Sequence, residues 1–201
     1  MAEDRGRRAL IVHGYESNPG RNWFGWLRGK LEADGYEVAL PALPNPDDPR
    51  LGAWLDALGS ALPPEAFGPE TLVVGHSLGC VTALRYLLRV DPPRPVAGVL
   101  LAAGFWQPLS AASSAGLGED DVRRIDGFVG TSLDFERLRR LARAFVVVSA
   151  EDDPIVPHEL SRNLATSLGA RFVSLPHGGH LMEEDGLTEF PLAYDELRSM
   201  M

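Results

Sequence analysis

The feature that most constrains the fold is a series of short apolar runs in which polar residues do not alternate. These runs are ALIV (9–12), TLVVG (71–75), PVAGVLLAA (95–103) and FVVVSA (145–150). A strand with one solvent-facing side alternates apolar and polar residues, whereas a strand covered on both faces is apolar throughout. The runs therefore predict strands of a parallel sheet with helices on both faces.

Segments with helical spacing lie between the runs. Residues 22–35 carry apolar side chains at 23, 24, 27 and 31, the spacing of one helix face. Further helices are predicted at 78–90, 133–144, 158–169 and 187–200, with another beginning near Asp47 or Asp48, and further strands at 36–40 and 170–176. Alternating strands and helices predict one α/β domain, residues 1–201, with a doubly wound sheet.

Charge and cysteine content exclude several classes of function. The formal net charge is −9, which argues against binding to nucleic acid or to an anionic membrane surface. No uncharged apolar run approaches the roughly 18 residues of a membrane span, and we expect no signal peptide. A lone cysteine, Cys80, allows no intramolecular disulfide, so we expect a cytoplasmic protein.

The sequence Gly75-His76-Ser77-Leu78-Gly79 fits the pattern G-x-S-x-G between a predicted strand and a predicted helix. In this setting a sharp turn lifts the serine hydroxyl above the sheet edge, and glycines allow strand and helix to approach. Such a pattern alone also occurs in turns where the serine merely caps a helix. With its strand–turn–helix context, it predicts that Ser77 is a nucleophile.

A serine nucleophile needs a base, and the base needs an acid that orients it. Acid and histidine are expected later in the chain, each after a strand. The strand at 145–150 precedes Asp152 and Asp153, and the strand at 170–176 precedes His177 and His180. We predict Asp153 as the acid, with Asp152 a solvated loop residue. His180 is predicted as the base because Gly178 and Gly179 precede it.

An acyl-transfer site also needs two N–H donors for the oxyanion. The N–H of Leu78 at the start of the helix is one candidate, and the N–H of Tyr15 in the loop after the first strand is the second, with Gly14 as an alternative. The substrate pocket is predicted to include His13, Trp23 and Trp106, although core packing is a competing interpretation for the aromatic residues. Residues 105–132 are the least regular stretch and are predicted to form a wall or lid.

Other chemistry has little support in the sequence. Cys80 follows the serine motif inside a helix and is predicted to be a buried, inert thiol. No clustered pattern of cysteine, histidine and carboxylate suggests a metal, and no glycine-rich phosphate loop suggests a nucleotide. We therefore expect neither metal nor cofactor.

Long stretches of the chain resemble the retinoblastoma-binding protein 9 / YdeN family of small serine hydrolases. The resemblance rests on the opening HGYESNPGRNWFGWLRGKLEADGYEVALPALPNPDDP, on VVGHSLG, on DDPIVP and on GGHLMEEDG. It implies a compact α/β-hydrolase with a six-stranded parallel sheet and no large cap domain. Carried over by motif, it implies Ser77 as nucleophile, Asp153 as acid and His180 as base.

One property of that family is not expected here. Binding to the retinoblastoma protein rests on the motif L-x-C-x-E, and this chain reads Leu78-Gly79-Cys80-Val81-Thr82, without the glutamate. No retinoblastoma-type partner is therefore predicted.

Together these features predict a metal-free serine hydrolase that cleaves small carboxylic esters, with amides and thioesters as further substrates to consider. Two alternatives stay open at the level of sequence. One is an acyltransferase or thioesterase with the same three residues, and the other is a binding protein that keeps the fold without turnover.

Overall fold

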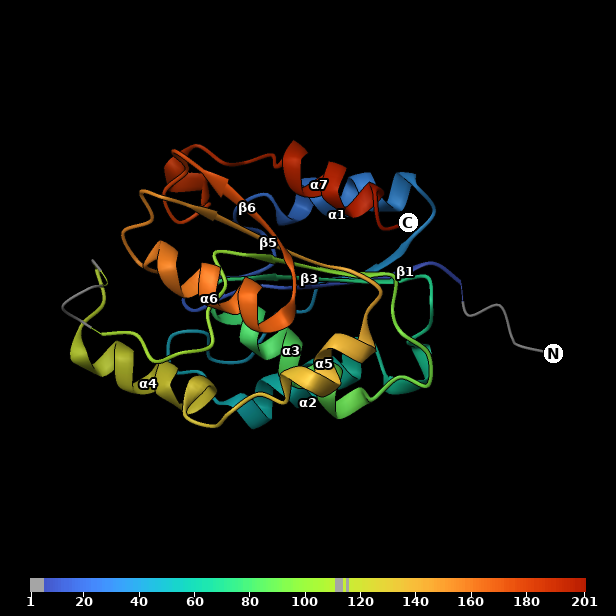
Figure 1. Cartoon of the computed structure of the whole chain (residues 1–201), viewed down its shortest axis with the longest axis horizontal. Helices are drawn as coiled ribbons and strands as arrows, with labels where there is room; N and C mark the ends of the chain where they lie inside the picture. The colour runs from blue at the N-terminus through green and yellow to red at the C-terminus, as the bar shows by residue number, and fades with distance from the viewer. Residues whose placement is uncertain (1–5, 111–113, 115) are drawn as a thin grey trace.

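The computed structural model describes residues 6–110, 114 and 116–201. Six strands form one parallel sheet in the order β2-β1-β3-β4-β5-β6 (Figure 1). The strands are β1 (Arg8–Val12), β2 (Glu37–Ala39), β3 (Thr71–His76), β4 (Gly98–Ala102), β5 (Phe145–Ala150) and β6 (Arg171–Leu175). The predicted α/β class and the six-stranded parallel sheet are confirmed.

Helices cover both faces of the sheet (Figure 1). One face carries α1 (Phe24–Ala33) and α7 (Pro191–Arg198). The other carries α2 (Leu51–Ala61), α3 (Leu78–Val90), α4 (Glu119–Val129), α5 (Phe135–Leu141) and α6 (His158–Leu168). Each face has its own buried apolar cluster, and the central strands β3, β4 and β5 are buried along their whole length. Burial on both faces explains why these strands read as unbroken apolar runs.

The irregular stretch at 105–132 differs from expectation, because it contains a helix. Helix α4 begins with Glu119, Asp120 and Asp121, and acids in a first turn interact favourably with the helix dipole. Its buried residues Ile125, Phe128 and Val129 have helical spacing, a signal present in the sequence. The described part of the stretch packs through α4 against α3, while residues 111–113 and 115 lie outside the described residues.

Two other helices begin later than predicted, each close to a proline. The residue before a proline is disfavoured in the helical region. Pro49 therefore disfavours a helix that already includes Asp48, and the N-cap of α2 is Arg50 rather than Asp47 or Asp48. Pro191 occupies the first helical position of α7, after Phe190 at φ −132° and ψ 72°.

The start of α3 lies in direct contact with the end of β1. A Cβ placed on Gly79, in the first turn of α3, would lie 2.2 Å from the carbonyl oxygen of Val12 and 2.5 Å from that of His13. Both oxygens belong to the backbone of a central strand end and its loop, so they cannot move aside cheaply. Only glycine allows this approach of helix to strand.

We therefore expect Gly79→Ala to destabilise the protein by about 1–3 kcal/mol, the range for overpacked sites. Urea unfolding followed by circular dichroism measures the change. The matched control is Gly29→Ala inside α1, where an added Cβ would meet nothing within 4 Å. That control should gain about 0.5–1 kcal/mol from helix propensity. Equal stability of Gly79→Ala and wild type would contradict the contact.

Candidate active site

The carboxyl ends of three parallel strands bring a serine, an aspartate and a histidine together. Ser77 follows β3, Asp153 follows β5 and His180 follows β6, so loops far apart in sequence meet at one edge of the sheet. His180 Nε2 lies 2.8 Å from Ser77 Oγ, and His180 Nδ1 lies 2.9 Å from Asp153 Oδ2. The three residues predicted from the sequence are thus joined by a continuous chain of hydrogen bonds.

Ser77 sits in a strained turn between β3 and α3. Its backbone has φ 53° and ψ −124°, a conformation that residues with a side chain rarely adopt. The Ser77 N–H donates to the Ala102 carbonyl at 2.9 Å, and the Cys80 N–H donates to the Ser77 carbonyl at 2.9 Å. A Cβ on Gly75 would lie 2.7 Å from the Cys80 Cα, so the tight turn also requires glycine at that position.

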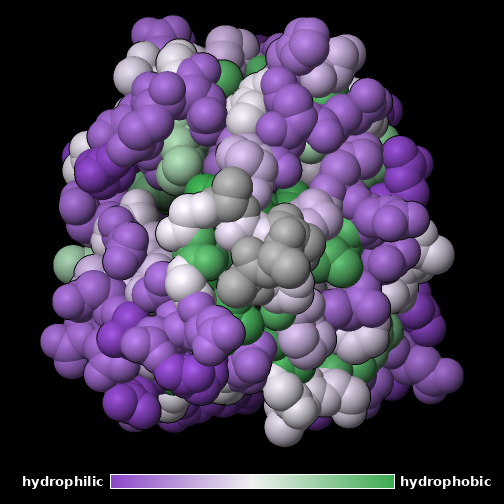
Figure 2. Space-filling view, turned by 90° about the vertical axis from the view of Figure 1, so that its left-hand side faces the viewer, coloured by the Kyte–Doolittle hydropathy of each residue, from purple (hydrophilic) through white to green (hydrophobic). Residues whose placement is uncertain are grey.

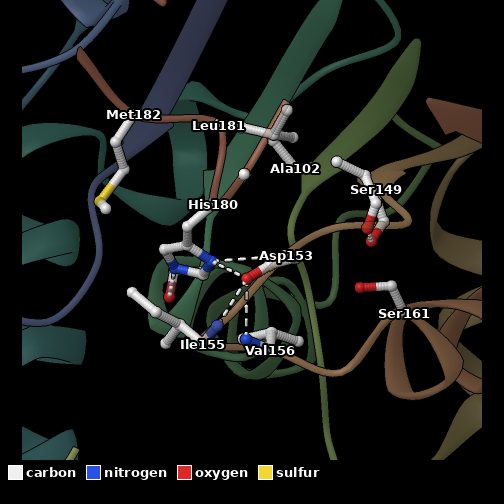
Figure 3. A network of polar contacts seen from close by, with 12 residues as sticks. Ala102, Ser149, Asp153, Ile155, Val156, Ser161, His180, Leu181 and Met182 are labelled. Atoms are coloured by element: carbon white, nitrogen blue, oxygen red, sulfur yellow. Dashed lines mark hydrogen bonds and ion pairs between the residues drawn. The ribbon is translucent and has the colours of Figure 1, made fainter. Parts of the chain in front are cut away.

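Asp153 is oriented by the loop that follows it. Its Oδ1 accepts hydrogen bonds from the N–H groups of Ile155 and Val156, each at 2.9 Å (Figure 3). Its side chain is fully buried, and that of His180 is 4% exposed. The carboxylate is therefore fixed with both oxygens near His180 Nδ1, Oδ2 at 2.9 Å and Oδ1 at 3.1 Å. A carboxylate partner favours the imidazole tautomer with the proton on Nδ1, which leaves Nε2 free to accept the Ser77 hydroxyl proton.

The neighbouring acid, Asp152, holds the backbone of the histidine loop. Its Oδ1 accepts hydrogen bonds from the N–H groups of Gly178 and Gly179, both at 3.0 Å, and its Oδ2 lies 3.1 Å from His177 Nδ1. The hydrogen bond from Gly179 is the main reason why the pKa of Asp152 is lowered. Asp152 is exposed, as expected for a loop acid, but it also anchors the segment that leads into His180.

The buried side chains of His76 and Trp23 also hold the segment around His180. His76 Nε2 donates to the backbone carbonyl of His180 at 2.8 Å, and Trp23 Nε1 donates to that of Leu181 at 3.0 Å. Burial lowers the pKa of His76 to about 3, so its ring is neutral near pH 7. Trp23 is completely buried and packs edge-on against His76 and Phe24. Trp23 is predicted to line the pocket, and it lies instead in the buried apolar cluster on the α1 face of the sheet.

The other two residues predicted for the pocket also lie elsewhere. His13 is completely buried, where its Nδ1 donates to the Gly14 carbonyl and its Nε2 accepts from the Leu43 N–H, each at 3.0 Å. It therefore ties the loop after β1 to the loop after β2. Trp106 packs edge-on against Phe135 with ring centroids 5.0 Å apart. Aromatic residues after strand ends are equally suited to core and pocket, and here the core contacts prevail.

The loop after β1 runs against the turn that carries Ser77. A Cβ on Gly14 would lie 3.0 Å from both the His76 carbonyl oxygen and the Ser77 Cβ. Tyr15 follows, and its hydroxyl donates to Asp121 of α4 at 2.8 Å. Burial, reinforced by this carboxylate, raises the pKa of Tyr15 to about 12, so the hydroxyl keeps its proton. Leu78 is the first residue of α3, and an N–H at that position has no acceptor within its own helix.

A cavity of about 300 Å³ opens beside Ser77 and His180. Its lining comes from the loop after β1, the turn at Ser77, the stretch from β4 into α4, and the loops after β5 and β6. The lining residues are Tyr15, Glu16, Ser17, Arg21, Asn22, His76, Ser77, Leu78, Phe105, Leu109, Gly116, Leu117, Ile125, Ile155, His180, Met182 and Glu184. In the view of Figure 2, hydrophobic residues gather near the centre of the surface, and hydrophilic residues surround them.

Other chemical groups contribute little to this site. Cys80 is completely buried, its thiol lies 3.3 Å from the Ala102 carbonyl oxygen, and burial raises its pKa well above the usual range. Among the described residues, no group of three or more histidines, cysteines or carboxylates is placed to hold a metal ion. No helix in the described ranges is long and apolar enough to cross a membrane.

Comparison with known proteins places the chain in a family. A model of the serine hydrolase family matches residues 9–199. The chain belongs to the serine hydrolase family. YdeN of Bacillus subtilis (strain 168) is 34% identical over 193 residues, which cover 96% of this chain and 95% of YdeN. The crystal structure of the ydeN gene product from B. subtilis matches with a TM-score of 0.86, over 96% of this chain and 98% of that chain.

A more distant relative belongs to the same group. The serine hydrolase RBBP9 of Rattus norvegicus is 23% identical over 180 residues, which cover 89% of this chain and 86% of that protein. The predicted resemblance to the retinoblastoma-binding protein 9 / YdeN family is confirmed. Family membership supports a hydrolase that acts on small molecules.

The hydrogen bonds of Asp152 lead to a prediction about the histidine loop. We expect Asp152→Ala to speed amide hydrogen exchange at Gly178 and Gly179, because both N–H groups lose their acceptor. Asp152→Asn keeps one carbonyl oxygen for the two donors, so it should exchange nearly as slowly as wild type. Exchange measured by NMR separates the two variants. Unchanged protection in Asp152→Ala would show that the carboxylate does not hold the loop.

Proposed function

We propose that this serine hydrolase cleaves carboxylic esters through Ser77, His180 and Asp153. The observation that carries the proposal is the unbroken hydrogen-bond chain from Ser77 Oγ through His180 to the buried Asp153 carboxylate. An unassisted serine is a poor nucleophile at neutral pH, and this arrangement supplies the base and its orienting acid. The site lies beside a cavity that admits a small molecule.

In the first half of the reaction, His180 Nε2 takes the proton of the Ser77 hydroxyl while Ser77 Oγ bonds to the ester carbonyl carbon. The carbonyl oxygen becomes an oxyanion, held by the N–H groups of Leu78 and Tyr15. The bond to the alcohol oxygen then breaks, and His180 returns its proton to that oxygen. Loss of one oxyanion donor costs about 3–4 kcal/mol of transition-state stabilisation in related chemistry.

In the second half, His180 takes a proton from water, whose oxygen attacks the acyl carbon bonded to Ser77 Oγ. Collapse of this second tetrahedral intermediate releases the carboxylic acid, and the proton returns to Ser77. Asp153 stays a carboxylate throughout and stabilises the imidazolium form of His180. If another molecule replaces water as the acceptor of the acyl group, the same steps describe an acyltransferase.

A cytoplasmic location is a separate prediction, made from the single cysteine.

The first test is covalent labelling of the nucleophile. We expect a fluorophosphonate probe to label wild type at neutral pH and to leave Ser77→Ala unlabelled, because the probe bonds to an activated serine oxygen. Labelled protein is read by in-gel fluorescence or intact mass. Ser60→Ala on the exposed face of α2 is the matched control and should label normally. An unlabelled wild type favours a binding protein without turnover.

A second test separates the two neighbouring acids. In Asp153→Asn, the amide oxygen can still accept from Ile155 and Val156, which turns the NH₂ group toward His180 Nδ1. The NH₂ group at the nearer position favours the His180 tautomer with its proton on Nε2, which cannot accept the Ser77 proton. We expect kcat for p-nitrophenyl acetate to fall by up to about 10⁴-fold.

The control for that test is Asp152→Asn, which keeps an acceptor for the histidine loop and should retain most of the activity. A larger loss in Asp152→Asn than in Asp153→Asn would reverse the assignment of the acid.

A further inference from the structure

The cavity beside Ser77 has an apolar side that is continuous with the protein core. It is formed by Phe105, Leu109, Leu117 and Ile125, all from the stretch between β4 and the middle of α4. Phe105, Leu109 and Ile125 are 1%, 5% and 2% exposed and belong to the buried cluster on the α3 face of the sheet. A group bound here is removed from water by surfaces that offer it hydrophobic contact.

The opposite side of the cavity is polar, and ion pairs connect the two segments that form it. Arg21 pairs with Glu184 and with Glu183, the latter at 2.5 Å between Nε and Oε1. The Asn22 N–H donates to the Glu183 carboxylate at 3.0 Å, and the Glu183 N–H donates to the Asn22 side-chain oxygen at 3.1 Å. These bonds join the loop after β1 to the segment that follows His180. Three residues of these two connected segments line the cavity, namely Arg21, Asn22 and Glu184.

The position of His180, the proposed base, determines on which side of the cavity the acyl part and the alcohol part of an ester lie. His180 returns its proton to the departing alcohol oxygen, so the alcohol must lie on the histidine side of Ser77. Glu184 lines the cavity four residues after His180, together with the apolar Met182, and Arg21 is paired with the same segment. The polar side therefore adjoins the base. The acyl group extends the other way, toward Phe105 and Ile125.

The charged residues of the polar side also restrict which alcohol can bind there. Arg21 is already neutralised by two glutamates, and Glu16 adds another carboxylate to the cavity lining. The polar side is thus net negative and repels an anionic leaving group. The volume of about 300 Å³ lies at the lower end of the range of about 300–1,000 Å³ for small-molecule sites, which favours a compact substrate.

We propose that the substrate is a compact ester that joins an apolar carboxylic acid to a polar alcohol without negative charge. This inference rests on the proposed hydrolase function. Ile125 of α4 is its specificity-determining residue on the acyl side, because the side chain is buried in the core and still lines the cavity.

The acyl side is tested with p-nitrophenyl acetate, butyrate and octanoate. We expect Ile125→Trp to lower the kcat/KM ratio of butyrate to acetate by at least about tenfold, because the larger ring fills the acyl side. Ile125→Ala should shift the preference toward octanoate. Val129→Ala is the matched control, since Val129 is also buried on α4 but does not line the cavity, and its chain-length preference should equal that of wild type. Unchanged preferences in both Ile125 variants overturn the assignment.

The alcohol side is tested on wild type with three butyrate esters. We expect 2-hydroxyethyl butyrate to be cleaved faster than butyl butyrate, and butyryloxyacetate, with its anionic leaving group, to be the poorest substrate. Equal or reversed rates overturn the proposal for this side. Fluorophosphonate labelling of the same preparation keeps the two proposals distinct. Labelled protein with the wrong preferences refutes only the substrate class, whereas unlabelled wild type refutes the hydrolase mechanism itself.

Discussion

The site depends on one strained backbone turn, in which Ser77 holds φ 53° between β3 and α3. Such a conformation costs of the order of 1–3 kcal/mol and persists only where the surroundings enforce it. Here the surroundings are backbone atoms: Gly75 lies against Cys80, and Gly79 lies against the end of β1. The hydroxyl is therefore presented by a closely packed part of the fold, the buried strands β1 and β3 and the helix α3 that packs against both.

Around that fixed serine, the histidine loop is held from several independent directions. Asp152 binds its backbone from the loop after β5, His76 binds the His180 carbonyl from β3, and Trp23 binds the Leu181 carbonyl from beside α1. Each contact uses a different element, so none of them has to define the position alone. Such preorganisation lets an active site favour a transition state without rearranging its own dipoles.

The sequence predicted the parallel sheet and the three residues at the strand ends because both follow from simple rules. Unbroken apolar runs indicate strands buried on both faces, and parallel strands bring their carboxyl ends to one edge. The pocket lining was not predictable in this way. None of the three side chains predicted for the pocket lines the cavity. His13 and Trp23 are buried and bond to neighbouring loops, and Trp106 packs against Phe135, an outcome that depends on packing partners distant in sequence.

Helix α4 links the shape of the cavity to the geometry around Ser77. Ile125 faces the cavity, and about one turn earlier Asp121 binds the hydroxyl of Tyr15, whose loop packs against the serine turn through Gly14. A shift of α4 that enlarges the cavity also pulls on that loop. Evolution of a new substrate preference can therefore exchange side chains of α4 but cannot move its backbone. Relatives that prefer different substrates should differ at position 125 more readily than at Asp121.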